Sequence, residues 1–213
     1  DFDKSIMDID GYESILQTIG NHDVYDAEGT APSGAYDDKQ YWATNEQKYK
    51  LWMMGKKDAS SQNNNIVNWG VTQPSGAGES GYYPCYYLKD YPNMKVRLIV
   101  LDSMDEDGAT EQLAWFNQAL NDTLDNNNSA YGYHVLLADH FATRTSFAET
   151  QYFNTGFNSL AGMFGNNVGT RIASYANAVD TFIGNGGCFI CWLCGHFHGD
   201  MVATTQTHPK QMF

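Results

Sequence analysis

The chain is poor in basic residues and in long apolar runs. Of its 213 residues, 12 are Lys or Arg and 25 are Asp or Glu, which gives a formal net charge of −13. Nucleic acids and anionic membranes bind positive surfaces, so this charge disfavours both as partners. No apolar run approaches the roughly 20 residues of a membrane span, and the sequence predicts none in this chain. An excess of carboxylates does suit a protein that binds divalent cations.

Cysteines are also few, and most of them lie in one segment. Cys188, Cys191 and Cys194 follow a C-x-x-C-x-x-C spacing, and Cys85 lies far upstream. The spacing matches part of an iron–sulfur motif, but the fourth cysteine is missing and the segment is apolar. Because free cysteines are often buried, we predict that these thiols are core residues rather than metal ligands.

Hydrophobic material is plentiful, at 42% of the residues, with 14 Tyr, 11 Phe and 5 Trp. This suffices for one sizeable domain with its own core. No internal repeat or second domain is visible, so residues 1–213 are predicted to form a single domain. The chain begins at Asp1 within ordinary folded sequence, and we interpret it as a fragment of a longer protein.

Predicted strands alternate with predicted helices along the chain. Short apolar runs predict strands at residues 15–19, 133–138, 188–194 and 201–205, and an antiparallel hairpin from residues 81–88 and 95–101 around a turn at 89–93. Helical spacing predicts three helices. The first begins near Asp37 and ends at Gly55. The second carries an apolar stripe of Leu113, Phe116 and Leu120, and the third carries one of Ile172, Tyr175, Ala176, Val179 and Ile183, with Gly184 as its cap. This alternation predicts a layered α/β fold.

Three of the predicted strands end in a turn that carries histidine. The turns are Gly20–Asp23, Asp139-His140 and Gly195–His198, and they hold four of the six histidines. In open α/β sheets the ligand site lies beyond the carboxyl ends of the strands. The three turns are therefore predicted to share one site.

Asn21, His22 and Asp23 form the first candidate group. The Asn21 carbonyl is a neutral oxygen ligand for a metal, and His22 is a candidate acid whose tautomer Asp23 would fix. Gly-Asn and His-Asp are also common turn residues, which is the alternative interpretation of this segment.

His196 and His198 form the second candidate group. At a spacing of two on a turn, they can serve two neighbouring ions, and the alternative is a pair of surface histidines in a loop. His140 alone is a weak candidate for a site residue, and it becomes a stronger one because two other strands also end in histidine-bearing turns. Asp139 beside it is either a hydrogen-bonding partner of the site or a solvated carboxylate. His134 is predicted to face the core or an adjacent helix. Arg144 is a weak candidate for a phosphate contact.

These segments resemble the motifs of the calcineurin-like metallophosphoesterases. Gly20-Asn-His-Asp23 is similar to the family's GNH[DE] motif, and Gly195-His-Phe-His198 is similar to its GHxH motif. The strand that ends at Asp102-Ser103 and the following Glu111–Phe116 segment also resemble a "strand, Asp-Ser, then Gln-Leu-x-Trp helix" stretch of the family. The tyrosine-rich hairpin and the His-Gly-Asp after the last motif resemble the bacterial and phage tail-associated branch.

The resemblance implies an α/β fold in which a layered β-sandwich is flanked by helices. It implies a phosphodiesterase or phosphomonoesterase with two divalent metal ions, a bridging hydroxide and a phosphoester substrate. Mixed nitrogen and oxygen ligands suit Mn, Fe or Zn. In this family pattern, His22 protonates the leaving group or contacts the phosphoryl oxygens, and Asp23 orients it. The implied metal ligands are Asn21, His140 and His196 for one ion, and His198 with Asp1 for the other.

One family motif has no counterpart in this chain. The family begins with Asp-x-His and a Gly-Asp motif, whereas no Asp-x-His precedes Gly20 here, and Asp1 is the expected remnant of the Gly-Asp motif. The resemblance thus implies that the first strand or strands are missing from this chain. A different class of protein stays open, namely a non-catalytic structural module of a phage tail or surface assembly that retains the fold. A metal-dependent nuclease is a weaker alternative, because the sequence offers no basic track for a polymer.

Overall fold

The structure, a computed structural model, describes residues 18, 70–74, 84–103, 109–140, 168–195, 202–203 and 211–212. This part of the chain has an α/β fold, as the sequence predicts, with a mixed sheet in the strand order β1-β2-β3-β4-β6-β5. The elements are β1 (Tyr87–Tyr91), the 3-10 turn η2 (Pro92–Met94), β2 (Val96–Val100), α5 (Ala109–Asn121), β3 (His134–Ala138), α7 (Val168–Gly184), β4 (Phe189–Leu193), β5 (Val202–Ala203) and β6 (Gln211–Met212).

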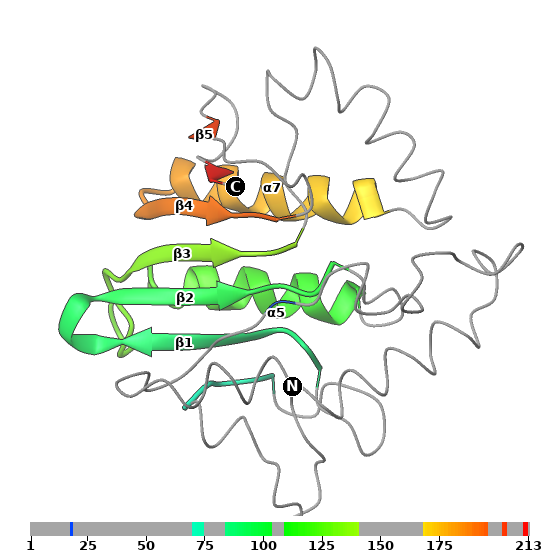
Figure 1. The fold of residues 1–213 in the computed structure, drawn as a ribbon. Coiled ribbons are helices and arrows are strands. Elements are labelled where there is room, and N and C mark those ends of the chain that lie inside the picture. The colour runs from blue at the N-terminus through cyan, green and yellow to red at the C-terminus, as the bar shows by residue number, and fades with distance from the viewer. Residues whose placement is uncertain are drawn as a thin grey trace, which may run out of the picture.

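The centre of the sheet is parallel. Strands β2, β3 and β4 are parallel neighbours in chain order, whereas β1 runs antiparallel to β2. At the other edge, β6 pairs parallel to β4 and antiparallel to β5. Parallel neighbours are joined by right-handed crossovers, so two successive crossovers in one direction place their helices on one face. Figure 1 shows α5 and α7 together on one face of the sheet.

The core lies between this face of the sheet and the two helices. Phe116 of α5 packs edge-on against Tyr175 of α7, with 5.7 Å between the ring centroids. The largest fully buried side chains come from both layers: Tyr86, Tyr87, Ile99, Leu101, Phe116, Leu120, Tyr175 and Trp192. The predicted stripe of the second helix is therefore correct for Phe116 and Leu120. In α7, Phe182 is buried and Ile183 is 43% exposed, so Ile183 does not belong to the core stripe.

The predicted antiparallel hairpin is confirmed, but its turn is shorter than predicted. Lys89, Asp90 and Tyr91 belong to β1, and the reversal is made by η2 and by Lys95, whose φ is 49°. Arg97 on β2 explains the longer strand, because its Nε and Nη2 donate to the two carboxylate oxygens of Asp90, each at 2.8 Å. Its Nη1 also donates to the Ala119 carbonyl, at 2.8 Å, near the carboxyl end of α5.

Helix α7 includes Gly184, which was predicted to be its cap, and the left-handed glycine lies two residues further along the chain. Gly186 instead takes the left-handed conformation, with φ 88°. Its N–H donates to the Ile183 carbonyl at 3.0 Å, and the Gly187 N–H donates to the Phe182 carbonyl at 2.9 Å. These paired bonds form a Schellman motif, which satisfies carbonyls that the helix itself leaves unpaired. A Cβ at Gly187 would lie 2.2 Å from the Phe182 ring, so this residue also needs to be glycine.

The prediction that β4 is a buried strand is only partly correct. Cys191 and Trp192 are buried, but Ile190 and Leu193 are 41% and 38% exposed. The pairing of β4 with β3 passes from Phe189 to Cys191 and skips Ile190, so burial along β4 does not alternate strictly from residue to residue. The predicted strand at 201–205 is confirmed at Val202–Ala203, whereas β6 was not predicted.

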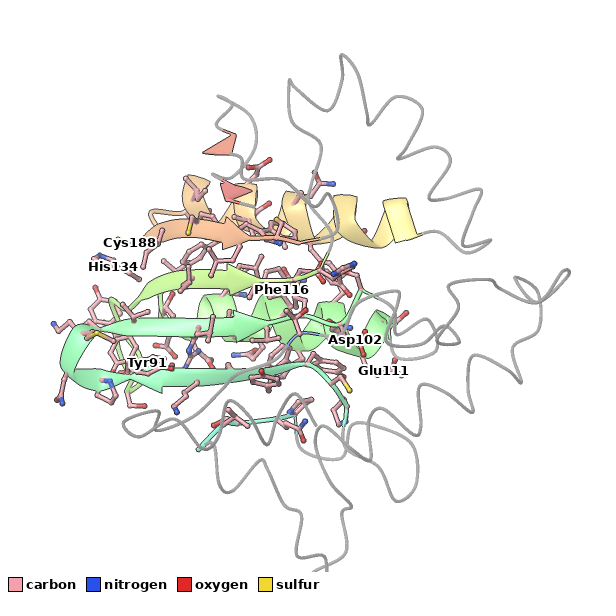
Figure 2. The ribbon with its side chains drawn as sticks, in the orientation of Figure 1. Tyr91, Asp102, Glu111, Phe116, His134 and Cys188 are labelled. Atoms are coloured by element: carbon pink, nitrogen blue, oxygen red, sulfur yellow. The ribbon has the colours of Figure 1, made fainter. Side chains whose placement is uncertain are left out.

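Two predictions for single residues at the amino ends of strands are wrong. Cys188 and His134 are exposed, whereas Cys188 was predicted to lie in the core and His134 to face the core or an adjacent helix. Both lie at the end of the sheet opposite Asp102 (Figure 2), where β3 and β4 begin. The predicted helix that ends at Gly55 and, apart from Thr18, the predicted strand at 15–19 lie outside the described residues.

Candidate functional site

The carboxyl ends of β2, β3 and β4 lie side by side. We call residues 101–103, 139–140 and 194–195 the carboxyl edge. Backbone hydrogen bonds continue across it beyond the strands, from Leu101 N to Ala138 O at 2.9 Å, and from Asp139 N to Leu193 O at 3.0 Å. The sheet thus brings together segments that lie far apart in the sequence. For the ends of β3 and β4, this proximity was predicted from the turns at Asp139-His140 and Gly195–His198.

Asp139 is a buried carboxylate, with only 1% of the residue exposed. Its Oδ2 accepts a hydrogen bond from Ser103 Oγ, and its Oδ1 accepts one from the backbone N–H of His140 at 2.8 Å. Of the two interpretations left open by the sequence, the solvated carboxylate is therefore wrong. Asp139 instead connects the end of β2 to the backbone of His140.

His140 lies half-buried at the carboxyl edge, beside the end of β4. Its carbonyl accepts a hydrogen bond from the Gly195 N–H at 3.0 Å. A Cβ at Gly195 would lie 3.4 Å from His140 Nδ1 and 3.8 Å from Cε1, so the imidazole rests directly against this glycine. These are ordinary van der Waals distances, so alanine would fit at position 195.

Asp102 is held in place by the first turn of α5. The N–H of Asp102 donates to Gln112 Oε1 and its carbonyl accepts from Gln112 Nε2, both at 2.8 Å. The side-chain amide of Gln112 thus satisfies both backbone groups of Asp102. In Figure 2, Asp102 lies at the carboxyl end of β2, close to Glu111 at the start of α5.

Cys194 is a neutral thiol at this edge. Burial raises its pKa well above the usual range, and the charge of Asp139 and the neighbouring Cys191 raise it further. A thiol in this state is a poor metal ligand and a poor nucleophile, since both roles need the thiolate. Among the described residues, no group of three or more His, Cys, Asp or Glu side chains is arranged to hold a metal.

Of the predicted site residues, the structure describes His140 alone. The others lie outside the described residues: Asp1, Asn21, His22, Asp23, His196 and His198, together with the weak candidate Arg144. The structure thus places one predicted ligand at the carboxyl edge, and the remaining assignments stay predictions.

Sequence reasoning missed the contact of Ser103 with Asp139 and the clamp of Gln112 on Asp102. The available signal was that β2 and β3 each run from apolar residues directly into polar ones, Asp102-Ser103 and Asp139-His140. In parallel strands such ends meet at one edge of the sheet. The partners themselves could not be read from the sequence, since 36 residues separate Ser103 from Asp139.

Comparison of the chain with protein-family models, with characterised proteins and with solved structures gives no match. The family resemblance therefore rests on the motifs of the sequence, and the α/β class rests on the structure. In the part of the chain that the structure describes, neither helix is long and apolar enough to cross a membrane.

Proposed function

We propose that the protein is a metal-dependent phosphoester hydrolase of the calcineurin-like type, with its active site at the carboxyl edge. Two divalent ions, Mn, Fe or Zn, would activate water and neutralise charge on the phosphate. Asn21, His140 and His196 would bind one ion, and His198 with Asp1 would bind the other. His22 would donate a proton to the leaving group, oriented by Asp23.

The position of His140 is the observation that carries the proposal. The GHxH-like motif begins at Gly195, whose N–H is bonded to the His140 carbonyl at 3.0 Å. His196 is covalently bonded to Gly195, and consecutive Cα atoms are about 3.8 Å apart. Two of the proposed ligands of one ion thus come from neighbouring strand ends, although more than 50 residues separate them in the sequence. An imidazole nitrogen is a donor that suits these metals.

The face of the sheet opposite α5 and α7 supports the finer fold proposal, a β-sandwich flanked by helices in one domain. Arg97 reaches α5, so Leu98 and Val100 lie on the opposite face. Leu193 lies on that face too, because it is in line with Val100 through Ala138. Val100 is 2% exposed, Leu98 is partly buried and Leu193 is 38% exposed. Apolar residues on both faces of a sheet are typical of a sheet that is covered on both sides. A second layer of this chain would bury them, which is the arrangement that the family resemblance implies.

Hydrolysis of bis-p-nitrophenyl phosphate by the natural full-length protein in the presence of Mn²⁺ tests the proposal. We expect activity that chelation by EDTA abolishes, and a loss of about 10²-fold or more in His22→Ala, the size typical of a missing general acid. His196→Ala should lose activity together with metal affinity. The matched control is His134→Ala, because His134 is exposed at the opposite end of the sheet.

The same experiment separates the enzyme from the structural module. Equal activity in the wild type, His22→Ala and His196→Ala would contradict the assignment of these residues. Bound metal without hydrolysis would favour the non-catalytic module of a phage tail or surface assembly.

A further inference from the structure

The backbone of His140 is held on both sides by groups of the carboxyl edge. Asp139 Oδ1 accepts from its N–H at 2.8 Å, and the Gly195 N–H donates to its carbonyl at 3.0 Å. Ser103 Oγ donates to the second carboxylate oxygen of Asp139. Ser103 and Asp139 are 0% and 1% exposed, so these bonds form in a place that bulk water does not reach.

We infer that Ser103 and Asp139 are positioning residues that fix His140 for metal binding. Ser103 orients the Asp139 carboxylate, the carboxylate fixes the His140 peptide, and the imidazole is thereby kept against Gly195. The inference rests on the proposed function, which makes His140 a metal ligand. Neither Ser103 nor Asp139 is a ligand in this arrangement, and both act through His140.

Chemistry and burial both favour this role. Hydrogen bonds to an ionised carboxylate are stronger than bonds between neutral groups, and a low local dielectric strengthens them further. Each of the two carboxylate oxygens accepts one of the bonds described, so rotation of the Asp139 side chain would break both. A ligand that is held in place before the metal arrives loses less conformational freedom on binding. Groups that bond the second ring nitrogen of a metal-binding histidine typically contribute about 10- to 100-fold to metal affinity or activity. Asp139 bonds the peptide of His140 instead, so we expect an effect at the lower end of this range.

Replacing Ser103 tests the inference with matched variants. Ser103→Ala removes the donor to Asp139, and Ser103→Thr retains a hydroxyl. Thr123→Val is the control, because Thr123 is also buried and its Oγ1 donates to the Leu120 carbonyl at 2.8 Å, at the end of α5. Each variant thus changes one buried hydroxyl, but only Ser103 contacts Asp139.

The first measurement is made without metal, on protein with ¹⁵N-labelled histidine rings, where His140→Gln identifies the His140 signals by NMR. We expect one sharp set of His140 signals, at the same shifts, in the wild type, Ser103→Thr and Thr123→Val. In Ser103→Ala these signals should move or broaden, because the peptide of His140 loses its fixed partner. Unchanged His140 signals in Ser103→Ala would overturn the inference.

The second measurement is Zn²⁺ affinity by calorimetry in the same proteins. Ser103→Ala should bind Zn²⁺ about 10-fold more weakly, whereas Ser103→Thr and Thr123→Val should match the wild type. Wild-type affinity in Ser103→Ala would overturn the inference. If the wild type bound no Zn²⁺ at all, the proposed function would fail instead, and the metal-free NMR measurement would still decide whether Ser103 positions His140.

Discussion

Single residues at the two ends of β4 differ sharply in chemistry, although both are cysteines of the same short motif. Cys188 is exposed, whereas Cys194 is half-buried, and desolvation together with the charge of Asp139 raises the pKa of its thiol. Since the thiolate is the reactive form, iodoacetamide at about pH 8 should modify Cys188 quickly and Cys194 far more slowly. Mass spectrometry of peptides after timed quenching measures this order.

The control for this prediction is Cys188→Ser, which should remove the fast phase and leave the slow one. In urea all four cysteines should react at similar rates, because none of them forms a disulfide. Modification of Cys194 as fast as Cys188 in the folded protein would contradict the raised pKa of the Cys194 thiol.

The prediction that the cysteines are core residues is correct for Cys85 and Cys191, which are buried, and only partly correct for Cys194, which is half-buried. It is wrong for Cys188, which immediately precedes β4 and is exposed. An apolar run indicates that a strand is present. It does not show how far along this strand the helix on the adjacent face extends, and so it does not show which strand residues are buried. Burial at a strand terminus depends on this tertiary contact, which a local pattern cannot supply.

At the scale of elements, two glycines at the end of α7 should respond oppositely to replacement by alanine: one variant should lower the free energy of unfolding and the other should raise it. Gly186 has φ 88°, which alanine adopts only with strain, whereas Gly184 is helical and has no atom within 4 Å of a new Cβ. Gly186→Ala should lower the free energy of unfolding by about 1 kcal/mol, and Gly184→Ala should raise it by about 0.5 kcal/mol. Urea denaturation measures both, and equal effects would contradict the Schellman motif.

The clamp of Gln112 on Asp102 ties α5 to the end of β2 and is a second test at this scale. Gln112→Ala removes two hydrogen bonds from a fully buried site and should lower the free energy of unfolding by about 2 kcal/mol. Gln118→Ala is the matched control on the same helix, because Gln118 is exposed, and its effect should stay below about 0.5 kcal/mol. Similar losses in both variants, measured by urea denaturation, would contradict the clamp.

The described helices and long strands were predictable, but their ends were less so. Helical spacing identified the core residues of α5, and the apolar runs identified β2, β3 and β4. The hairpin turn was misplaced because the pair of Arg97 and Asp90 extends β1, and this pair forms only when the two strands are in register. Strand β6 was missed because two residues, Gln211–Met212, are too short to show any periodicity.

For the whole molecule, the sequence predicted the α/β class, and it also predicted that His140 and Gly195 lie at one edge of the sheet. This succeeded because the carboxyl ends of neighbouring parallel strands meet, whatever the intervening loops do. The network behind His140 could not be predicted, because Ser103 and Asp139 become partners only through the pairing of β2 with β3. The sequence therefore predicts which residues lie at the strand ends, whereas the hydrogen bonds between the strand ends are known only once the pairing of the strands is known.

The most direct test of the proposed two-metal site is an anomalous difference map from crystals of the full-length protein grown with Mn²⁺. We expect two peaks about 3.5–4 Å apart at the carboxyl edge, the separation typical of two-metal phosphoesterase sites. One peak should lie within bonding distance of an imidazole nitrogen of His140, and it should be absent in His140→Ala. A map with Mn²⁺ bound elsewhere, and no peak beside His140, would contradict the metal site at the ends of β3 and β4.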